Sequence, residues 1–177
     1  DQVGGTPTYA DLTQLLAAPA APAGSAITQR LSAGGVVSID PALAAYAVTA
    51  GASGGPTQRG IASIFEKFLT QQGPVIEEGK VVTEPLFDPA VSVTGYPITE
   101  PYWLRVPVGG VQRDVLIQCF QRRCLTYTPS NPAGWQVEMS NIGLAYQQWV
   151  TTDPPMASTA TPASFVPGLG SLALGYW

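Results

Sequence analysis

The strongest helical pattern in the chain lies in its first half. Five apolar side chains are spaced i, i+3, i+4, i+7 and i+8 and so share one helix face, namely Ile61, Ile64, Phe65, Phe68 and Leu69. The helix is expected to end at Gly73-Pro74, because proline cannot continue the helical hydrogen bonds. A shorter helix is predicted to begin at Thr8 and to end before Pro19.

Strand patterns dominate the second half. Three β-rich segments are predicted to form an antiparallel meander, at 102–108, 111–120 and 124–128. Turns are expected at Gly109-Gly110, where glycine allows the positive φ of a tight turn, and at Arg122-Arg123. The proline-rich loop 129–134 ends the third strand, since it cannot continue a ladder.

A helix is predicted to cover this meander. Its apolar residues again follow helical spacing, namely Ile142, Ala145, Tyr146 and Trp149. We therefore treat residues 94–149 as one unit, a three-stranded meander capped by a helix.

The first half holds weaker strand patterns. Residues 27–40 are interpreted as a hairpin or a pair of edge strands, because they contain Val36, Val37 and Ile39 bounded by Gly34-Gly35 and Pro41. Residues 43–49 are balanced between helix and strand, because their alanines favour one and the Tyr46/Val48 alternation the other. A small hairpin is predicted at 76–82, with its turn at Glu78-Gly79.

These patterns predict an α+β fold of small antiparallel β-meanders, each packed with a helix, with extended N- and C-terminal arms. Three regions are expected. They are an N-terminal helix and Pro/Ala-rich arm at 1–24, a single body at 25–150, and a Pro/Thr-rich linker with an apolar C-terminal arm at 151–177.

The C-terminal arm offers more apolar surface than a soluble monomer usually exposes. Seven of its residues are predicted to mediate assembly, namely Phe165, Val166, Leu169, Leu172, Leu174, Tyr176 and Trp177. Three prolines in 151–162 extend the linker, which favours a neighbouring copy over docking on the same chain.

Charge narrows the possible partners. Charged residues are only 11% of the chain, and the net charge is −4. Nucleic acid is not an expected partner, because its binding needs clustered cations. No run reaches the roughly 18 apolar residues of a spanning helix. The chain begins at Asp1, and we expect that a leader was removed and that the protein is extracellular or on the cell surface.

The sequence lacks the residue types that several kinds of catalytic and metal site require. There is no histidine, which removes the Ser-His-Asp arrangement and imidazole metal sites. Two cysteines cannot supply a four-ligand zinc site, so neither a cofactor nor a metal is predicted, and no catalytic residue is assigned. Loose groups of carboxylates could still form a glycoside-cleaving pair, namely Glu77, Glu78, Glu84, Asp88 and Glu138.

Cys119 and Cys124 flank the sequence FQRR. If Arg122-Arg123 alone make the turn, the two cysteines lie diagonally on one face. If all four residues loop out, the cysteines face each other, which suits a disulfide better. In an oxidising compartment we expect the bridge, with two buried thiols as the alternative.

Aromatic residues gather in the second half. A sugar-binding surface would need exposed rings beside polar groups. The candidate ligand-binding residues are Tyr96, Trp103, Gln121, Arg122, Arg123, Tyr127 and Trp135. Core packing is the more usual role of such rings.

Part of the second half resembles a known family. The order GYPITE, QCFQRR, LTYTP and a closing helix resembles the LGFP repeat of bacterial cell-wall-associated proteins, and the matching residues are Gly95-Tyr96-Pro97, Phe120, Tyr127 and Pro129. The chain departs at Arg122-Arg123, where the family often has Asn-Gly, and in a longer insertion before the second strand. Residues 61–149 also resemble an uncharacterised C-terminal module of secreted proteins from thermophilic bacteria. Both resemblances imply an extracellular, non-catalytic role in or near the cell envelope.

The sequence thus predicts a secreted, non-enzymatic structural protein of the bacterial surface that assembles with copies of itself, as a filament or a surface layer. The alternative is a module that binds cell-wall polysaccharide or peptidoglycan. A glycoside-cleaving enzyme is the weakest of the three hypotheses.

Overall fold

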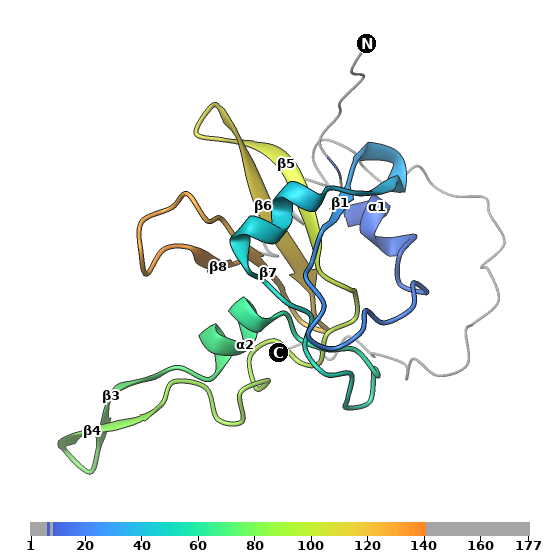
Figure 1. Cartoon of the computed structure of the whole chain (residues 1–177). Helices are drawn as coiled ribbons and strands as arrows, with labels where there is room; N and C mark the ends of the chain where they lie inside the picture. Colours follow the sequence, from blue (N-terminus) through green and yellow to red (C-terminus); the bar gives the residue numbers. More distant parts are fainter. Residues whose placement is uncertain (1–6, 8, 141–177) are drawn as a thin grey trace, which may run out of the picture. The chain divides into compact units, whose positions relative to one another are not determined.

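The structure, a computed structural model, describes residue 7 and residues 9–140 (Figure 1). A six-stranded mixed sheet forms the centre, in the order β2-β1-β5-β6-β7-β8. The strands span Gln29–Leu31 (β1), Val37–Ile39 (β2), Tyr102–Val108 (β5), Val111–Cys119 (β6), Cys124–Tyr127 (β7) and Val137–Met139 (β8). The predicted C-terminal helix and arm lie outside the described residues.

The predicted meander is confirmed. β5, β6 and β7 pair antiparallel in sequence order. Gly109 and Gly110 have φ values of 60° and 80°, and two positive φ values in a row suit the twist of a two-residue hairpin turn. β8 extends the meander by a fourth strand. This three-residue strand was not predicted, because its sequence is too short to show a period.

The first half adds to the same sheet. β1 and β2 form the antiparallel pair expected within 27–40. β1 then lies parallel to β5, with Arg30 opposite Trp103. The prediction of separate meanders, each with its own helix, is therefore wrong in this detail. Within the described residues the fold is mostly β, with few short helices.

The described helices are short. They are α1 (Tyr9–Thr13), the 3-10 turns η1 (Ala33–Gly35) and η2 (Pro41–Tyr46), and α2 (Ser63–Leu69). α1 and α2 were predicted. The ambiguous 43–49 segment divides, because η2 ends at Tyr46 and Thr49 forms an isolated β-bridge with Ala26. α2 packs on β7 and β8, so a helix from the first half covers the meander here.

Each sheet face carries its own core. Trp103, Leu116 and Tyr127 are register partners and pack with Phe65 of α2. On the opposite face Tyr102 and Ile117 pack with Leu12 of α1. Side chains alternate between faces along a strand, so β5, β6 and β7 are buried on both sides. This double burial explains why their hydrophobic pattern is noisy.

A buried amide fixes the 51–62 loop against the sheet. Gln118 of β6 is fully buried. Its Nε2 donates to the carbonyls of Gly60 and Thr99, and its Oε1 accepts from the amide of Ala62. A Cβ on Gly60 would collide with the carbonyl of Gly51, so the loop needs glycine where its backbone crosses itself.

A separate two-stranded hairpin extends from the body (Figure 1). It consists of β3 (Gln72–Glu77) and β4 (Lys80–Pro85). The turn at Glu78-Gly79 is confirmed by φ values of 49° and 77°. The hairpin is longer than predicted, and Gly73-Pro74 lies inside β3 instead of ending α2, which stops at Leu69.

Candidate functional site

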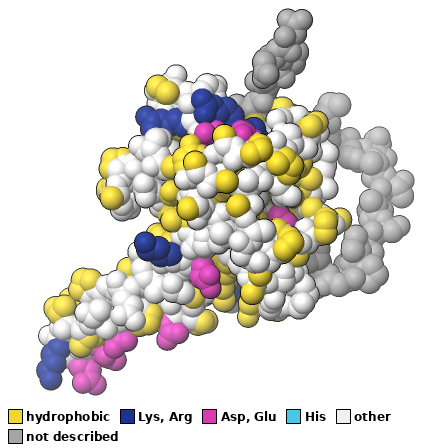
Figure 2. All heavy atoms as spheres, in the orientation of Figure 1, with side chains coloured by type: hydrophobic (Ala, Val, Ile, Leu, Met, Phe, Trp, Pro, Cys, Tyr) yellow, Lys and Arg dark blue, Asp and Glu magenta, His cyan; other side chains and the backbone are white. Residues whose placement is uncertain are grey.

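The β3–β4 hairpin presents an apolar pair to solvent. Ile76 and Val81 are register partners, and they are 79% and 73% exposed. On the other face of the hairpin, Val75 and Val82 are register partners, and both are half-buried. We call Ile76 and Val81 the hairpin pair. Figure 2 shows apolar surface along this projection, with charged side chains at its tip.

The hairpin is also acidic. Glu77, Glu78 and Glu84 carry three negative charges, and Lys80 carries the one positive charge of these two strands and their turn. The excess is two negative charges (3 − 1). All four side chains are exposed. A partner surface for this hairpin therefore needs an apolar floor and a positive charge at its edge.

An open groove of about 480 Å³ lies between α2 and the β7–β8 loop. We call it the α2 groove. Its lining combines apolar side chains with Lys67 and two glutamines, and consists of Ile64, Lys67, Phe68, Thr70, Gln71, Gly134, Gln136 and Val137. Trp135 lies between two lining residues in the sequence, Gly134 and Gln136, and its side chain is 71% exposed. The groove therefore has an amphipathic lining and a large aromatic side chain nearby.

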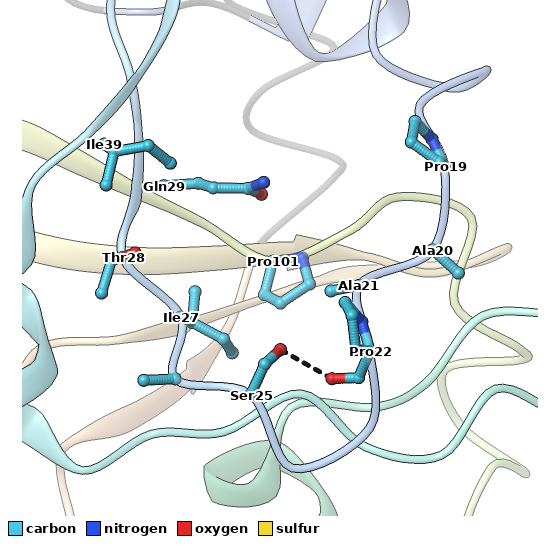
Figure 3. A pocket seen from close by; sticks show the side chains of 11 residues that line it. Pro19, Ala20, Ala21, Pro22, Ser25, Ile27, Thr28, Gln29, Ile39 and Pro101 are labelled. Atoms are coloured by element: carbon cyan, nitrogen blue, oxygen red, sulfur yellow. Dashed lines mark hydrogen bonds between the residues drawn. The ribbon is translucent and has the colours of Figure 1, made fainter.

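A second cavity, of about 240 Å³, lies between the Pro19–Pro22 segment and β1 (Figure 3). Ile27, Ile39 and Pro101 contribute apolar walls. Ser25 donates its hydroxyl to the carbonyl of Pro22. The lining residues include no charged side chain, so the cavity offers shape but little chemistry for a specific ligand.

Two of the predicted ligand residues are part of the core. Trp103 is fully buried, its Nε1 donates to the carbonyl of Ile27, and its ring stacks on Tyr46 at a centroid distance of 4.7 Å. Tyr127 is also buried and lies 6.2 Å from Trp103, centroid to centroid. Neither ring presents a face to solvent.

Three other predicted residues do come together. The amide of Tyr96 donates to Oε1 of Gln121, and the amide of Gln121 donates to the carbonyl of Tyr96. The amide of Arg122 donates to the carbonyl of Thr94, and its guanidinium to that of Ser92. The turn that carries these exposed side chains is thus hydrogen-bonded to the 92–96 segment.

The remaining predicted residues lie beside this turn or away from it. Arg123 is exposed, and its carbonyl accepts from the amide of Phe120. The residues at the tip of the turn are therefore Gln121-Arg122 and not Arg122-Arg123. Trp135 lies on the β7–β8 loop, where its amide donates to the carbonyl of Pro132.

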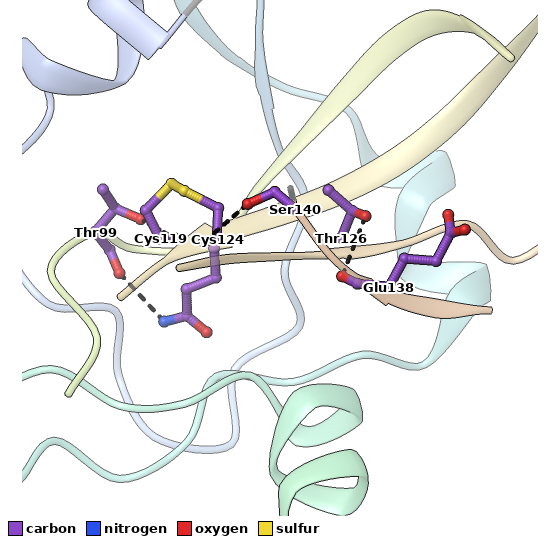
Figure 4. Close-up of a disulfide and its surroundings, with 7 residues drawn as sticks. Thr99, Cys119, Cys124, Thr126, Glu138 and Ser140 are labelled. Atoms are coloured by element: carbon purple, nitrogen blue, oxygen red, sulfur yellow. Dashed lines mark hydrogen bonds between the residues drawn. A yellow bond between two sulfur atoms is a disulfide. The ribbon is translucent and has the colours of Figure 1, made fainter. Parts of the chain in front are cut away.

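The predicted disulfide is present between Cys119 and Cys124 (Figure 4). The two residues are directly opposite in the β6–β7 register, so FQRR is a four-residue connection between the strands with Gln121-Arg122 at its tip. The amide of Cys119 bonds to the Thr99 hydroxyl and that of Cys124 to the Ser140 hydroxyl. The cysteines thus occupy a non-hydrogen-bonded pair, where the strands come closest, and their Cα atoms are 3.9 Å apart.

A charged cluster connects β1, β5 and β6. The Asp114 carboxylate accepts from Arg30 at 2.9 Å and lies 3.2 Å from Arg105. The hydroxyl of Tyr46 also donates to it. Burial alone would raise the pKa of Asp114, but these hydrogen bonds outweigh burial and hold the pKa below its usual value. The cluster therefore links the neighbouring strands β1, β5 and β6 through ion pairs.

The same cluster shifts two neighbouring groups. The hydrogen bond from Arg30 lowers the pKa of Asp40, and Arg30 lies 2.7 Å from that carboxylate. Burial, followed by the hydrogen bond to Asp114, raises the pKa of Tyr46. Each of these groups forms an ion pair or a hydrogen bond within the cluster. We therefore assign the cluster a role in stabilising the fold.

The carboxylates considered for glycoside cleavage are scattered over exposed positions. Glu77, Glu78 and Glu84 lie on the hairpin, Asp88 follows it, and Glu138 lies on β8. None of them lines either cavity. Among the described residues no group of three or more histidine, cysteine, aspartate or glutamate side chains could hold a metal. No helix in this part of the chain could span a membrane.

The hairpin pair and the α2 groove were not predicted as sites. A signal was available for the pair, because the dipeptides Val75-Ile76 and Val81-Val82 place an apolar residue on each face of a two-stranded ribbon. One packed face cannot bury both. The groove joins segments about seventy residues apart in the chain, and no local pattern reports such a contact.

Comparison with family models, with curated proteins and with solved structures finds no match for this chain.

Proposed function

We propose that the protein is a secreted, non-enzymatic structural protein that associates with copies of itself. The hairpin pair is the observation that carries this proposal. Ile76 and Val81 are more than 70% exposed on a projecting ribbon. An isolated two-stranded hairpin is only marginally stable in water, so a partner that covers it would stabilise both the ribbon and the assembly.

The energetic argument is direct. Apolar surface removed from water contributes about 25 cal/mol per Å². Covering both faces of the hairpin would therefore favour association, provided that the gain exceeds the loss of translational freedom. Proteins usually avoid long exposed strand edges, because such edges recruit other chains. The β3–β4 ribbon has six-residue strands and projects from the body. Its acidic charge would favour a partner surface of opposite charge over other chains.

An extracellular location is part of the proposal. The cross-strand disulfide between Cys119 and Cys124 is typical of oxidising compartments. The low charge content and the LGFP-like residues Gly95-Tyr96-Pro97 agree with a role at the bacterial envelope. The apolar arm at 163–177, which lies outside the described residues, is proposed to add to the same assembly.

Light scattering of the purified full chain over a range of concentrations tests the proposal. We expect the mean mass to rise above that of the monomer. The double substitution Ile76→Thr with Val81→Thr keeps β-branched side chains but removes apolar surface, and it should weaken association. Val111→Thr, at another exposed valine, is the matched control. A wild-type chain that stays monomeric at every concentration refutes the proposal.

A polysaccharide-binding role is the second candidate. Trp135 favours it, because its ring is 71% exposed on a loop beside an amphipathic groove. The exposed turn at Tyr96, Gln121 and Arg122 provides a second polar and aromatic surface. Co-sedimentation with peptidoglycan tests this role. Binding that Trp135→Ala removes would support it, and no binding by the wild type would reject it.

A further inference from the structure

We infer that the β3–β4 hairpin of one copy occupies the α2 groove of a second copy, and that the exchange is reciprocal. This inference rests on the proposed self-association and names the two surfaces that meet. The hairpin pair, Ile76 and Val81, is the inserted element. The receptor consists of α2 and the β7–β8 loop of the partner.

The two surfaces match in polarity. Ile64, Phe68 and Val137 give the α2 groove an apolar floor, and each of these side chains is only partly buried. The groove measures about 480 Å³, which lies within the range of pockets that hold sizeable ligands. Two branched aliphatic side chains, Ile76 and Val81, would occupy part of it and make apolar contacts with its floor.

The two surfaces also match in charge. Lys67 is exposed, and it is the one charged residue in the groove lining. The hairpin carries an excess of two negative charges, from Glu77, Glu78 and Glu84 against Lys80. Opposite charges at the edge of an apolar contact steer two surfaces into register and disfavour wrong partners. Lys67 is therefore expected to face the acidic hairpin of the partner.

Chain connectivity explains why the hairpin would contact a second copy and not its own groove. Gln71 lines the groove, and Gln72 begins β3, so each hairpin leaves its own body at the edge of the groove. The hairpin then extends away from that body (Figure 1). At about 3.3 Å per residue, a six-residue strand carries the tip about 20 Å from its base. The tip thus reaches a neighbour and not its own groove.

A reciprocal exchange of this kind closes on itself. Both copies use the same two surfaces, so a two-fold axis relates them and the product is a dimer. A head-to-tail contact would instead continue into a filament. The dimer can serve as the unit from which a larger surface assembly is built.

Mixed cysteine cross-linking tests the contact directly. One preparation carries Val81→Cys and the other Gln71→Cys, both at exposed positions. We expect a mixed disulfide dimer on mild oxidation. Val81→Cys mixed with Gln112→Cys, at an exposed position on β6, is the control and should give no cross-link above background. Equal cross-linking of the two mixtures overturns the inference.

A charge exchange tests the same contact in solution. Lys67→Glu and the Glu77→Lys/Glu78→Lys variant should each weaken dimerisation roughly tenfold. Combining all three substitutions in one chain should restore it. Circular dichroism and urea unfolding verify that each variant is folded.

The outcomes separate the two proposals. If the wild-type chain is monomeric, both the proposed self-association and this inference fail. If it associates, but neither the cross-link nor the charge exchange has an effect, only the inference fails. If deletion of residues 163–177 abolishes association while the hairpin variants behave as wild type, the C-terminal arm is the occupant and the inference is overturned.

Discussion

Nη1 of Arg59 lies 2.8 Å from Oε1 of Glu100, and the two side chains are only 10% and 4% exposed. Nη2 of the same guanidinium donates to the carbonyls of Leu16 and Ala18. The second oxygen of Glu100 accepts from the amide of Ala21. This pair ties the N-terminal segment to the 51–60 loop and to the segment before β5.

Glu100→Gln is expected to lower the free energy of unfolding by about 3–5 kcal/mol, because it leaves the Arg59 charge buried without its counter-charge. Urea denaturation measures the loss. Glu66→Gln makes the same change at an exposed position of α2 and should stay within about 0.5 kcal/mol of wild type. Equal effects of the two substitutions would contradict the structural role of the pair.

Trp103 and Trp135 were both predicted from the sequence as ligand contacts, but their substitution by alanine should have different effects on stability. Trp103→Ala removes a fully buried ring and should cost about 3–5 kcal/mol of stability. Trp135→Ala removes an exposed ring and should change the stability by less than about 0.5 kcal/mol. Thermal unfolding of both variants gives the comparison. A stable Trp103→Ala protein would show that the ring is not part of the core.

The central meander could be predicted from sequence because its turns are local. Gly109-Gly110 is a two-residue signal that needs no distant partner, and Glu78-Gly79 marks the separate β3–β4 hairpin in the same way. The parallel pairing of β1 with β5 could not be predicted in this way. It depends on Arg30 meeting Asp114 and on Trp103 meeting Ile27, which are 84 and 76 residues apart in the chain.

The candidate site was predicted only in part. Gln121 and Arg122 are neighbours in the chain, whereas Tyr96 lies 25 residues before Gln121 and meets it only through the fold. Trp103 was included because its residue type suits ligand binding, while its position opposite Leu116 places it in the core. Composition does not distinguish a buried ring from an exposed one. The α2 groove could not be predicted from the sequence, because its two walls are brought together only by the tertiary fold.

The disulfide should be observable by intact mass. Without reductant, alkylation should add no label to the chain, and after reduction it should add two. Two labels without reductant would exclude the bridge. The variant Cys119→Ser/Cys124→Ser should be less stable by about 2 kcal/mol, since the bridge closes a loop of only six residues. A larger loss would indicate that packing around the sulfurs also contributes.

Asp114 should make the protein sensitive to acid. Its pKa is lower in the folded state than its usual value of about 3.9, so the unfolded chain binds more protons near that pH. The stability that Asp114 contributes is complete above about pH 5, and it is lost as the pH falls through the folded pKa.

Asp114→Asn should accordingly be less stable at pH 7, by about 1–3 kcal/mol. Its stability should also change less between pH 5 and pH 3 than that of the wild type. Urea denaturation at several pH values gives both results. Asp88→Asn, at an exposed position, is the control. Parallel pH curves for wild type and Asp114→Asn would refute the assignment.

The long-range contacts of β1 have a consequence for the order of folding. The Trp103–Ile27 hydrogen bond spans 76 residues and the Arg30–Asp114 ion pair spans 84. Such contacts stabilise the chain only after the entropy cost of closing a long loop has been met. β5, β6 and β7 are joined by short turns and can form a nucleus on their own. Substitutions such as Leu116→Ala should therefore slow refolding, whereas Leu31→Ala should mainly speed unfolding, and stopped-flow kinetics would distinguish the two. During synthesis β1 would thus emerge before β5, β6 and β7 but reach its native place after them.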